Sequence, residues 1–142
     1  MNGDLTREFL DTNVLVYAYD VSAGDKHVRA VELLDDVAST ERGVLSVQVL
    51  QELFVTLTMK VPEPLVVREA ALLVSDLGAM PTHAPGVDDV IAAIEVHRRL
   101  RLSFWDAMIL HSATEMGCGV LWSEDVSQSK RYNGTEVRNP FI

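Results

Sequence analysis

Apolar positions along the chain follow two spacings, one typical of short buried strands and one typical of amphipathic helices. Short apolar runs predict strands at 7–10, 43–47, 79–83, 119–122 and 136–138. Apolar residues spaced three and four apart predict helices at 14–19, 26–38, 47–61, 65–77, 87–100 and 104–116. Prolines and glycines at the ends of these runs support the boundaries, and Ser46 is placed to cap the helix at 47–61.

Short strands that alternate with longer helices imply crossover connections and a parallel sheet covered on both faces. We therefore expect an α/β fold, a three-layer α/β/α sandwich around a short-stranded parallel sheet. The chain has 142 residues, 48% of them apolar, and contains no internal repeat or linker. These features predict a single domain over residues 1–142.

Cysteine content and the first residues bear on the cellular compartment. Cys118 is the single cysteine, so no intramolecular disulfide can form, which fits a reducing compartment. Residues 1–8 are polar and acidic, where a signal peptide would be basic and then apolar. No apolar run approaches the roughly 18 to 20 residues that span a bilayer. We expect a cytoplasmic protein without a membrane partner.

The net charge is acidic and unevenly distributed. Twelve Lys and Arg residues against 21 Asp and Glu residues give a formal charge of −9, which argues against coating of nucleic acid by bulk positive charge. From His97 onward there are six basic and five acidic residues, a balance of +1, so the first 96 residues carry −10. A locally basic surface therefore remains compatible with the acidic total.

Two aspartates follow predicted strands. Asp11 comes after the strand at 7–10, and Asp125 comes shortly after the strand at 119–122. In open α/β sheets, ligands bind at the carboxyl ends of the strands. The alternatives are that Asp11 or Asn13 caps the next helix, and that Asp125 belongs to an ordinary turn. The role of Glu124, a second carboxylate beside Asp125, stays open.

Two further acids lie on or beside predicted helices. Glu52 is placed next to the apolar arc of the helix at 47–61, where a carboxylate needs a partner or a cation unless it reaches water at the border. Asp106 follows Ser103 by three residues, which matches a capping box, so helix capping is the simpler interpretation when this motif is taken alone.

Taken together, the four acids favour a metal site. In a parallel sheet, Asp11 and Asp125 project from the same edge, where a helix start carrying Asp106 can meet them. Such a cluster is stabilised by a hard cation with oxygen ligands, Mg²⁺ or Mn²⁺, and suits phosphodiester cleavage. A zinc site is disfavoured, because one cysteine offers little and the four histidines are scattered along the sequence: His27, His83, His97 and His111.

Four segments, in order, resemble the PIN-domain family. They are Phe9-Leu10-Asp11-Thr12-Asn13-Val14-Leu15, Gln51-Glu52-Leu53, Phe104-Trp105-Asp106-Ala107 and Leu121-Trp122-Ser123-Glu124-Asp125. More narrowly, the chain is similar to VapC-type toxins of toxin–antitoxin pairs, and Asn139-Pro140-Phe141 resembles their common ending. The resemblance implies a metal-dependent endoribonuclease on an α/β/α sandwich, neutralised by a cognate antitoxin protein and commonly homodimeric.

The resemblance also implies roles for individual residues. Asp11, Glu52, Asp106 and Asp125 form the acidic catalytic site, and Ser123 takes the family's Ser/Thr-x-Asp position. We expect Asp11, Asp106 and Asp125 to ligate Mg²⁺, with Mn²⁺ able to substitute, while Glu52 orients water or completes the shell. Residues expected to contact RNA are Ser123, Arg98, Arg101, Lys130 and Arg131. The alternative for the arginines near 100 is a solvated helix end favoured by its dipole.

Other functions fit the residues less well. A receiver domain needs paired acids after the first strand, where Asp11 stands alone, and a haloacid-dehalogenase-like phosphatase needs Asp at position 13, which is Asn. The remaining alternative is a catalytically silent PIN-like module that binds RNA or a partner protein. Aromatic residues at apolar positions favour core packing over base stacking; they are Tyr17, Tyr19, Phe54, Trp105 and Trp122.

Overall fold

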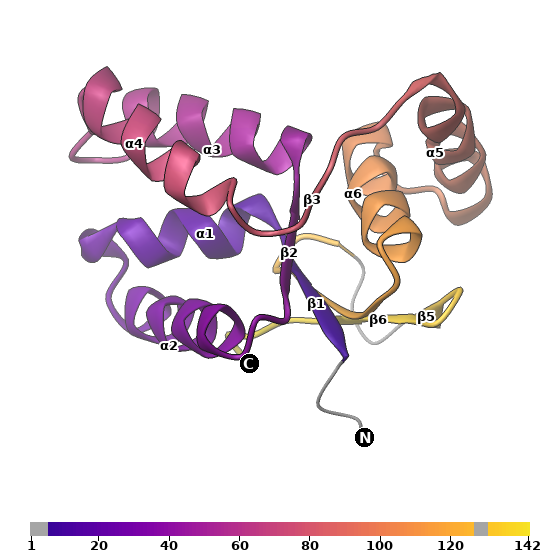
Figure 1. Ribbon diagram of the computed structural model, residues 1–142, viewed down its shortest axis with the longest axis horizontal. Coiled ribbons are helices and arrows are strands. Elements are labelled where there is room, and N and C mark those ends of the chain that lie inside the picture. Colours follow the sequence, from indigo (N-terminus) through magenta and orange to yellow (C-terminus); the bar gives the residue numbers. More distant parts are fainter. Residues whose placement is uncertain (1–5, 127–130) are drawn as a thin grey trace.

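The computed structural model describes residues 6–126 and 131–142, and in these segments the strands form one mixed sheet (Figure 1). The strands are β1 (Arg7–Leu10), β2 (Gly43–Ser46), β3 (Thr82–His83), β4 (Cys118–Trp122), β5 (Arg131–Tyr132) and β6 (Thr135–Arg138). Their order across the sheet is β3-β2-β1-β4-β6-β5. All neighbours are parallel except β5 and β6, which form an antiparallel pair.

Helices cover both faces of the sheet. They are α1 (Thr12–Tyr19), α2 (Asp25–Ser39), α3 (Val47–Met59), α4 (Val67–Leu77), α5 (Val87–Leu100) and α6 (Phe104–Glu115), with a short 3₁₀ turn, η2 (Val21–Ala23), before α2. Figure 1 shows α1 to α4 on one side of the strands and α5 and α6 on the other. The predicted α/β/α arrangement is therefore confirmed, with a sheet that is mostly parallel.

The central strands build the core because both of their faces are covered. Phe9 and Leu10 of β1, Val44 and Leu45 of β2, and Leu121 of β4 are all fully buried. A parallel strand covered on both sides has no polar face, which explains its continuous apolar run. Each such side chain contributes about 1.5–3 kcal/mol by leaving water. Within the described residues, no helix is both long and apolar enough to cross a membrane.

Every predicted boundary except the start of the strand at 79–83 agrees with the structure to within two residues. Helix α4 begins at Val67 rather than residue 65, because the Leu65 N–H bonds to the Leu57 carbonyl at the end of α3. The predicted strand at 79–83 shortens to Thr82–His83, and α1 begins at Thr12, directly after Asp11.

Strand β5 was missed by the sequence analysis. It forms a β-hairpin with β6 through a two-residue turn, and Tyr132 pairs with Thr135. The turn residues Asn133 and Gly134 both have positive φ, 46° and 90°. Asn-Gly between two strands is a strong hairpin signal because such turns need positive φ at both positions. The sequence therefore contained the signal for β5.

Candidate active site

The ends of β1 and β4 place Asp11 and Ser123 side by side. Leu10 pairs with Trp122 in the sheet, and the Asp11 N–H donates to the Trp122 carbonyl at 3.0 Å. The fully buried Ser123 hydroxyl donates to Asp11 Oδ2 at 2.7 Å and accepts from the Asp125 and Val126 N–H groups, each at 3.1 Å. The expected substrate contact of Ser123 stays a prediction, and in this structure its hydroxyl is buried against Asp11. Ser123 positions Asp11 and Asp125.

Asn13 connects the first and last loops of the site. Its amide nitrogen donates to Asp11 Oδ2 at 3.3 Å and to Asp125 Oδ2 at 3.2 Å, and its carbonyl oxygen accepts from the Glu124 N–H at 3.2 Å. Asp11 also caps α1, because its Oδ1 accepts from the Thr12 N–H at 2.7 Å. The two interpretations of Asp11 in the sequence are therefore compatible: the capping carboxylate faces Asp125 across Asn13.

Glu52 on α3 turns toward the same edge of the sheet. Its carboxylate accepts from the Thr12 hydroxyl at 2.7 Å and from Gln48 Nε2 at 3.2 Å. Gln48 Nε2 also lies 3.3 Å from the carbonyl oxygen of Trp105, which ties α3 to the first turn of α6. The other amide atom, Gln48 Oε1, is buried and has no hydrogen-bond partner in the described part of the chain. Thr12 and Gln48 thus hold Glu52 toward the site.

Asp106 lies in the first turn of α6. Its N–H donates to the Ser103 hydroxyl at 3.1 Å, which is one half of the predicted capping box. The other half, in which the Ser103 N–H would donate to the Asp106 carboxylate, is absent from the hydrogen bonds of residues 6–126 and 131–142. Burial raises the pKa of Asp106, the charges of Asp125 and Glu52 raise it further, and the Ser103 hydroxyl lowers it. The Asp106 carboxylate is therefore close enough to Asp125 and Glu52 to be affected by their charges.

The buried carboxylate of Asp11 shows the electrostatic state of this site most clearly. Its side chain is only 5% exposed, and burial raises its pKa to about 6. Hydrogen bonds from Ser123 and Thr12 lower the pKa, while the charges of Glu52 and Asp106 raise it. Among the described residues, none of the ion pairs formed by Lys or Arg involves the four acids. The site therefore carries uncompensated negative charge.

This donor set fits a hydrated divalent cation of the Mg²⁺ type. All four charged groups are carboxylates, the ligands that hard cations prefer. The Asn13 amide lies between Asp11 and Asp125, so the carboxylates are spread rather than closed around one point. Mg²⁺ keeps several of its waters, which suits a spread set. The unpartnered Gln48 Oε1 could accept a hydrogen bond from a water molecule bound to such an ion.

A groove leads away from the acids between α1 and α3. Its volume is about 570 Å³, and its lining includes Asn13, Glu52 and Asp125 at the acidic end. Tyr17 and Lys60 also line it, and Lys60 is the one Lys or Arg among its described lining residues. The groove therefore reaches two of the four carboxylates, Glu52 and Asp125.

Glu124 is occupied by contacts of its own. Its carboxylate accepts from the Tyr17 hydroxyl at 2.8 Å and forms an ion pair with Lys26. Phe141, in the segment that resembles the ending of VapC-type toxins, packs edge-on against Tyr17 with ring centroids 5.1 Å apart. These contacts hold the Glu124 side chain on α1 and α2, so it has a structural role beside Asp125.

The basic residues predicted to contact RNA do not line the groove. Arg98 forms an exposed ion pair with Glu95, and Arg131 pairs with Glu136 at 3.2 Å. Arg101 ends α5 in the left-handed conformation, with φ of 57°. Lys130 lies outside the described residues. The Arg99 guanidinium donates to the Tyr132 hydroxyl at 3.0 Å, so the end of α5 and β5 lie together as one basic surface.

The aromatic residues divide between core and surface. Tyr19 and Trp122 pack against the core as expected, and Tyr17 packs against it while also lining the groove. Trp105 is 61% exposed and packs edge-on against Phe104, so the expectation that it belongs to the core is wrong. Trp105 and the buried Ala107 are two residues apart, about 200° around α6, so they face opposite sides of the helix.

The histidines are not all scattered. The rings of His83 and His111 lie with centroids 6.1 Å apart, and Asp89 contacts both. In the described part of the chain, the group whose potential ligand atoms all lie within 4.8 Å of one another is Asp89, His111 and Glu115. This second group could not be predicted from the sequence, because Asp89 and His111 are far apart in the chain and belong to different helices.

Comparisons with known proteins agree with the fold and with the resemblance to the PIN-domain family. The family model described as the PIN domain matches residues 9–133. The crystal structure of Mycobacterium tuberculosis VapC20, described as a sarcin–ricin loop cleaving toxin, superimposes with a TM-score of 0.63 at 17% identity, covering 83% of this chain and 89% of that chain. Among curated proteins, no sequence matches.

Two toxin–antitoxin complexes show the same fold. The VapBC2 complex of Rickettsia felis bound to promoter DNA gives a TM-score of 0.65 at 16% identity, covering 94% of this chain and 98% of that chain. DNA-bound VapBC of Salmonella typhimurium gives 0.65 at 18% identity, covering 95% and 98%. The family model spans most of the chain, including all four acids. The chain therefore belongs to the PIN domain family.

Proposed function

We propose that this protein is a metal-dependent endoribonuclease and the toxin of a toxin–antitoxin pair. The observation that carries the proposal is the gathering of four carboxylates near the carboxyl ends of β1 and β4, none of them in an ion pair with a Lys or Arg of residues 6–126 and 131–142. Mutual repulsion of the carboxylates lowers the stability of the fold. A bound cation relieves this repulsion, so the arrangement suits a reaction that depends on a cation.

In this proposal Asp11, Asp106 and Asp125 hold Mg²⁺, with Mn²⁺ as a substitute. When bound, the ion supplies Lewis acidity toward the scissile phosphate and neutralises its charge. Asp11 is fixed by three hydrogen bonds, from Thr12, Asn13 and Ser123, so its oxygens are oriented before any ligand arrives. Glu52, held by Thr12 and Gln48, is placed to accept a proton from, or to orient, the attacking water.

RNA is the proposed substrate, and the groove between α1 and α3 is its proposed path. Lys60 supplies a cation for a phosphate at a distance from the acids, and Tyr17 offers part of a ring face. The solved toxin of Mycobacterium tuberculosis is described as cleaving an RNA loop, which supports this substrate class. Arg98, Arg101 and Arg131 are proposed to contact flanking phosphates from the basic surface at the end of α5.

The proposed protein partners are a cognate antitoxin and a second copy of the chain. Helix α5 exposes four apolar residues at helical spacing, each with 40–76% of its surface accessible to solvent: Val87, Val90, Ile91 and Ile94. A stripe of this kind is typical of a surface covered by another protein. The VapBC complexes among the structural neighbours support an antitoxin partner, and an antitoxin arginine could pair bidentately with the acids. We place the protein in the cytoplasm.

The test is cleavage of single-stranded and stem-loop RNA by the purified full chain with Mg²⁺, with Mn²⁺ and in excess EDTA. We expect cleavage with either metal and none in EDTA. Asp125→Asn should lower the rate by at least about 100-fold, because it removes a charged ligand. The matched control is Glu63→Gln, an exposed acid in the loop before α4, which should cleave like the parent. Undiminished cleavage by folded Asp125→Asn, or in EDTA, contradicts the proposal. RNA binding without cleavage under all conditions supports the silent binding module instead.

A further inference from the structure

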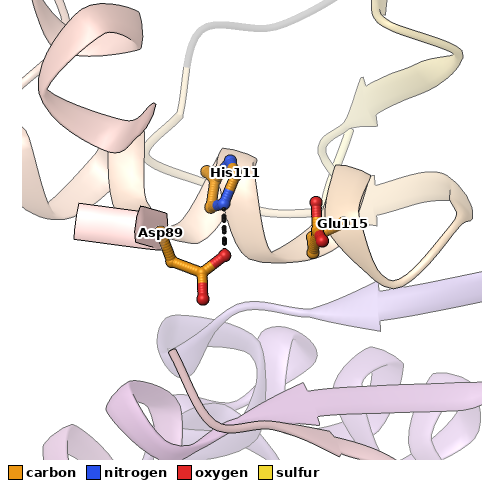
Figure 2. A group of neighbouring side chains, drawn as sticks. All are labelled: Asp89, His111 and Glu115. Carbon is orange, nitrogen blue, oxygen red and sulfur yellow. Dashed lines mark hydrogen bonds and ion pairs between the residues drawn. The ribbon is translucent and has the colours of Figure 1, made fainter. Parts of the chain in front are cut away.

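A second cluster joins β3, α5 and α6 through one carboxylate. Asp89, in the first turn of α5, lies with Oδ1 2.8 Å from His111 Nε2 and with Oδ2 3.6 Å from His83 Nε2. The Gly86 N–H donates to Asp89 Oδ2 at 2.8 Å. Figure 2 shows the Asp89 carboxylate facing the His111 ring, with Glu115 further along the same helix. None of these side chains belongs to the four-acid site.

The His83 ring is held in one orientation by a buried serine. His83 Nδ1 lies 2.8 Å from the Ser112 hydroxyl, and both residues are buried. When Nδ1 carries the proton and donates to Ser112, Nε2 presents a lone pair toward Asp89. Fixing a histidine through its other ring nitrogen is the arrangement that orients metal-binding imidazoles.

The distance between His83 and Asp89 favours a shared cation over a direct bond. At 3.6 Å, the contact between His83 Nε2 and Asp89 Oδ2 is too long for a hydrogen bond. Two ligands of a tetrahedral Zn²⁺ lie roughly 3.3 Å apart, given Zn–N and Zn–O bonds near 2.0–2.1 Å. The spacing of His83 and Asp89 therefore lies close to the spacing of two zinc ligands. His111 Nε2 and Asp89 Oδ1, at 2.8 Å, instead form a direct hydrogen bond, which must open for both atoms to bind one ion.

Glu115 offers a fourth donor. It lies four residues after His111, so both side chains occupy the same face of α6. The candidate ligand atoms of Asp89, His111 and Glu115 all lie within 4.8 Å of one another. His83 lies outside that three-residue group and reaches it through Asp89, with Nε2 3.6 Å from Oδ2. With His83 included, two imidazoles and two carboxylates form a mixed nitrogen and oxygen set, which suits Zn²⁺ and related first-row ions better than Mg²⁺.

We propose that His83, Asp89, His111 and Glu115 form a structural site for a divalent first-row transition ion, with Zn²⁺ as the representative ion. The site fastens α5 to β3 and α6. Helix α5 packs along α6, and Ala93 and Val96 are its buried residues. Both lie beyond the first turn, so a metal crosslink at Asp89 would add a contact at the start of the helix.

The experiment is a calorimetric titration of the metal-stripped full chain with ZnCl₂ in excess Mg²⁺. Mg²⁺ occupies the all-carboxylate site and competes poorly for imidazole. We expect one Zn²⁺ per chain, and at least about a tenfold loss of affinity in His111→Gln and in His83→Gln. Ser112→Ala should weaken binding by about 10–100-fold, because the His83 ring loses its orienting partner. His97→Gln is the matched control, since His97 is exposed at the far end of α5, and it should bind like the parent.

Two further measurements keep the test decisive. Glu115 is exposed, so Glu115→Gln should fold normally and still bind Zn²⁺ more weakly than the parent. Nitrogen NMR of the parent should show His83 and His111 bound to the ion through Nε2. Absence of Zn²⁺ binding by the parent, or equal affinity in Glu115→Gln, His111→Gln and His97→Gln, would overturn the proposal and leave a hydrogen-bonded clamp of α5.

Discussion

Two aspartates that neighbour α6 have pKa values shifted in opposite directions. The pKa of Asp106, at the start of the helix, is raised by burial and by the charges of Asp125 and Glu52. The pKa of Asp89, beside the middle of the helix, is lowered, chiefly by its hydrogen bond to His111 and then by the Gly86 N–H. The residue type is the same, so the neighbours decide the direction.

The opposite pKa shifts distinguish two regions. In the four-acid site the carboxylates repel one another and need an external cation, whereas the Asp89 carboxylate already has hydrogen-bond partners in the protein. The four-acid site has acceptors and negative charge in excess, so its ligand must bring positive charge. In the second cluster, the Asp89 carboxylate already accepts from the Gly86 N–H and contacts the His111 ring, and Glu115 lies nearby, so the cluster offers a mixed nitrogen and oxygen donor set to a softer ion. Four predictions test this contrast.

The largest expected effect is on catalysis at the uncompensated region. Asp106→Asn should reduce Mg²⁺-dependent RNA cleavage by at least about 100-fold while the fold is retained, because the asparagine N–H can still donate to the Ser103 hydroxyl. Single-turnover cleavage and circular dichroism of the same preparation measure the two quantities. A folded Asp106→Asn that cleaves at the parent rate would remove this acid from the site.

The second prediction concerns pH and the burial of Asp11. Its folded pKa of about 6 lies above its ordinary value of 3.8, so the folded state binds the proton more tightly. In EDTA, unfolding free energy should therefore rise as pH falls from about 7 toward 4, by about 3 kcal/mol from this group.

Urea unfolding between pH 4 and pH 7 measures this slope, and Asp11→Asn should flatten it. The Asp89 contribution has the opposite sign, because its folded pKa is lowered. That contribution is present above 3.8 and is lost as pH falls below it. A parent curve that declines steadily from pH 7 to pH 4 would contradict the raised pKa of Asp11.

The third prediction is stabilisation of the parent by Mn²⁺. A ligand that binds only the folded chain stabilises it by about 2.7 kcal/mol at 100 times its dissociation constant. The melting temperature of the parent should rise with Mn²⁺ concentration, and that of Asp11→Asn should rise much less. Glu63→Gln serves as the control for general charge effects. Equal shifts in all three proteins would mean that Mn²⁺ acts elsewhere.

The smallest effect is expected at the helix cap. Ser103→Ala removes the acceptor of the Asp106 N–H and should cost about 1 kcal/mol of stability, the same in EDTA and in Mn²⁺. Urea unfolding in both buffers checks this. A cost that appears only with Mn²⁺ would make Ser103 part of the metal site rather than a cap.

The sequence by itself determined the local elements and the acids at their ends. Periodicity reports which face of a strand or helix is buried, so the strand at 7–10 and the helix at 87–100 have the predicted bounds. Chain order then places Asp11 and Asp125 at one edge, because parallel strands end on the same side. The Asn133-Gly134 turn shows that part of the missed structure was also encoded locally.

Only the tertiary structure decided which side chains meet. Asn13 between two aspartates, Gln48 between α3 and α6, and Ser123 buried beneath Asp11 depend on how the elements pack. His83 and His111 lie 28 residues apart in the sequence, in β3 and α6, and they become neighbours because those elements pack beside α5. Hydrophobic spacing encodes burial along one element and contains no information about polar contacts between two, which is why the histidine cluster could not be found before the fold.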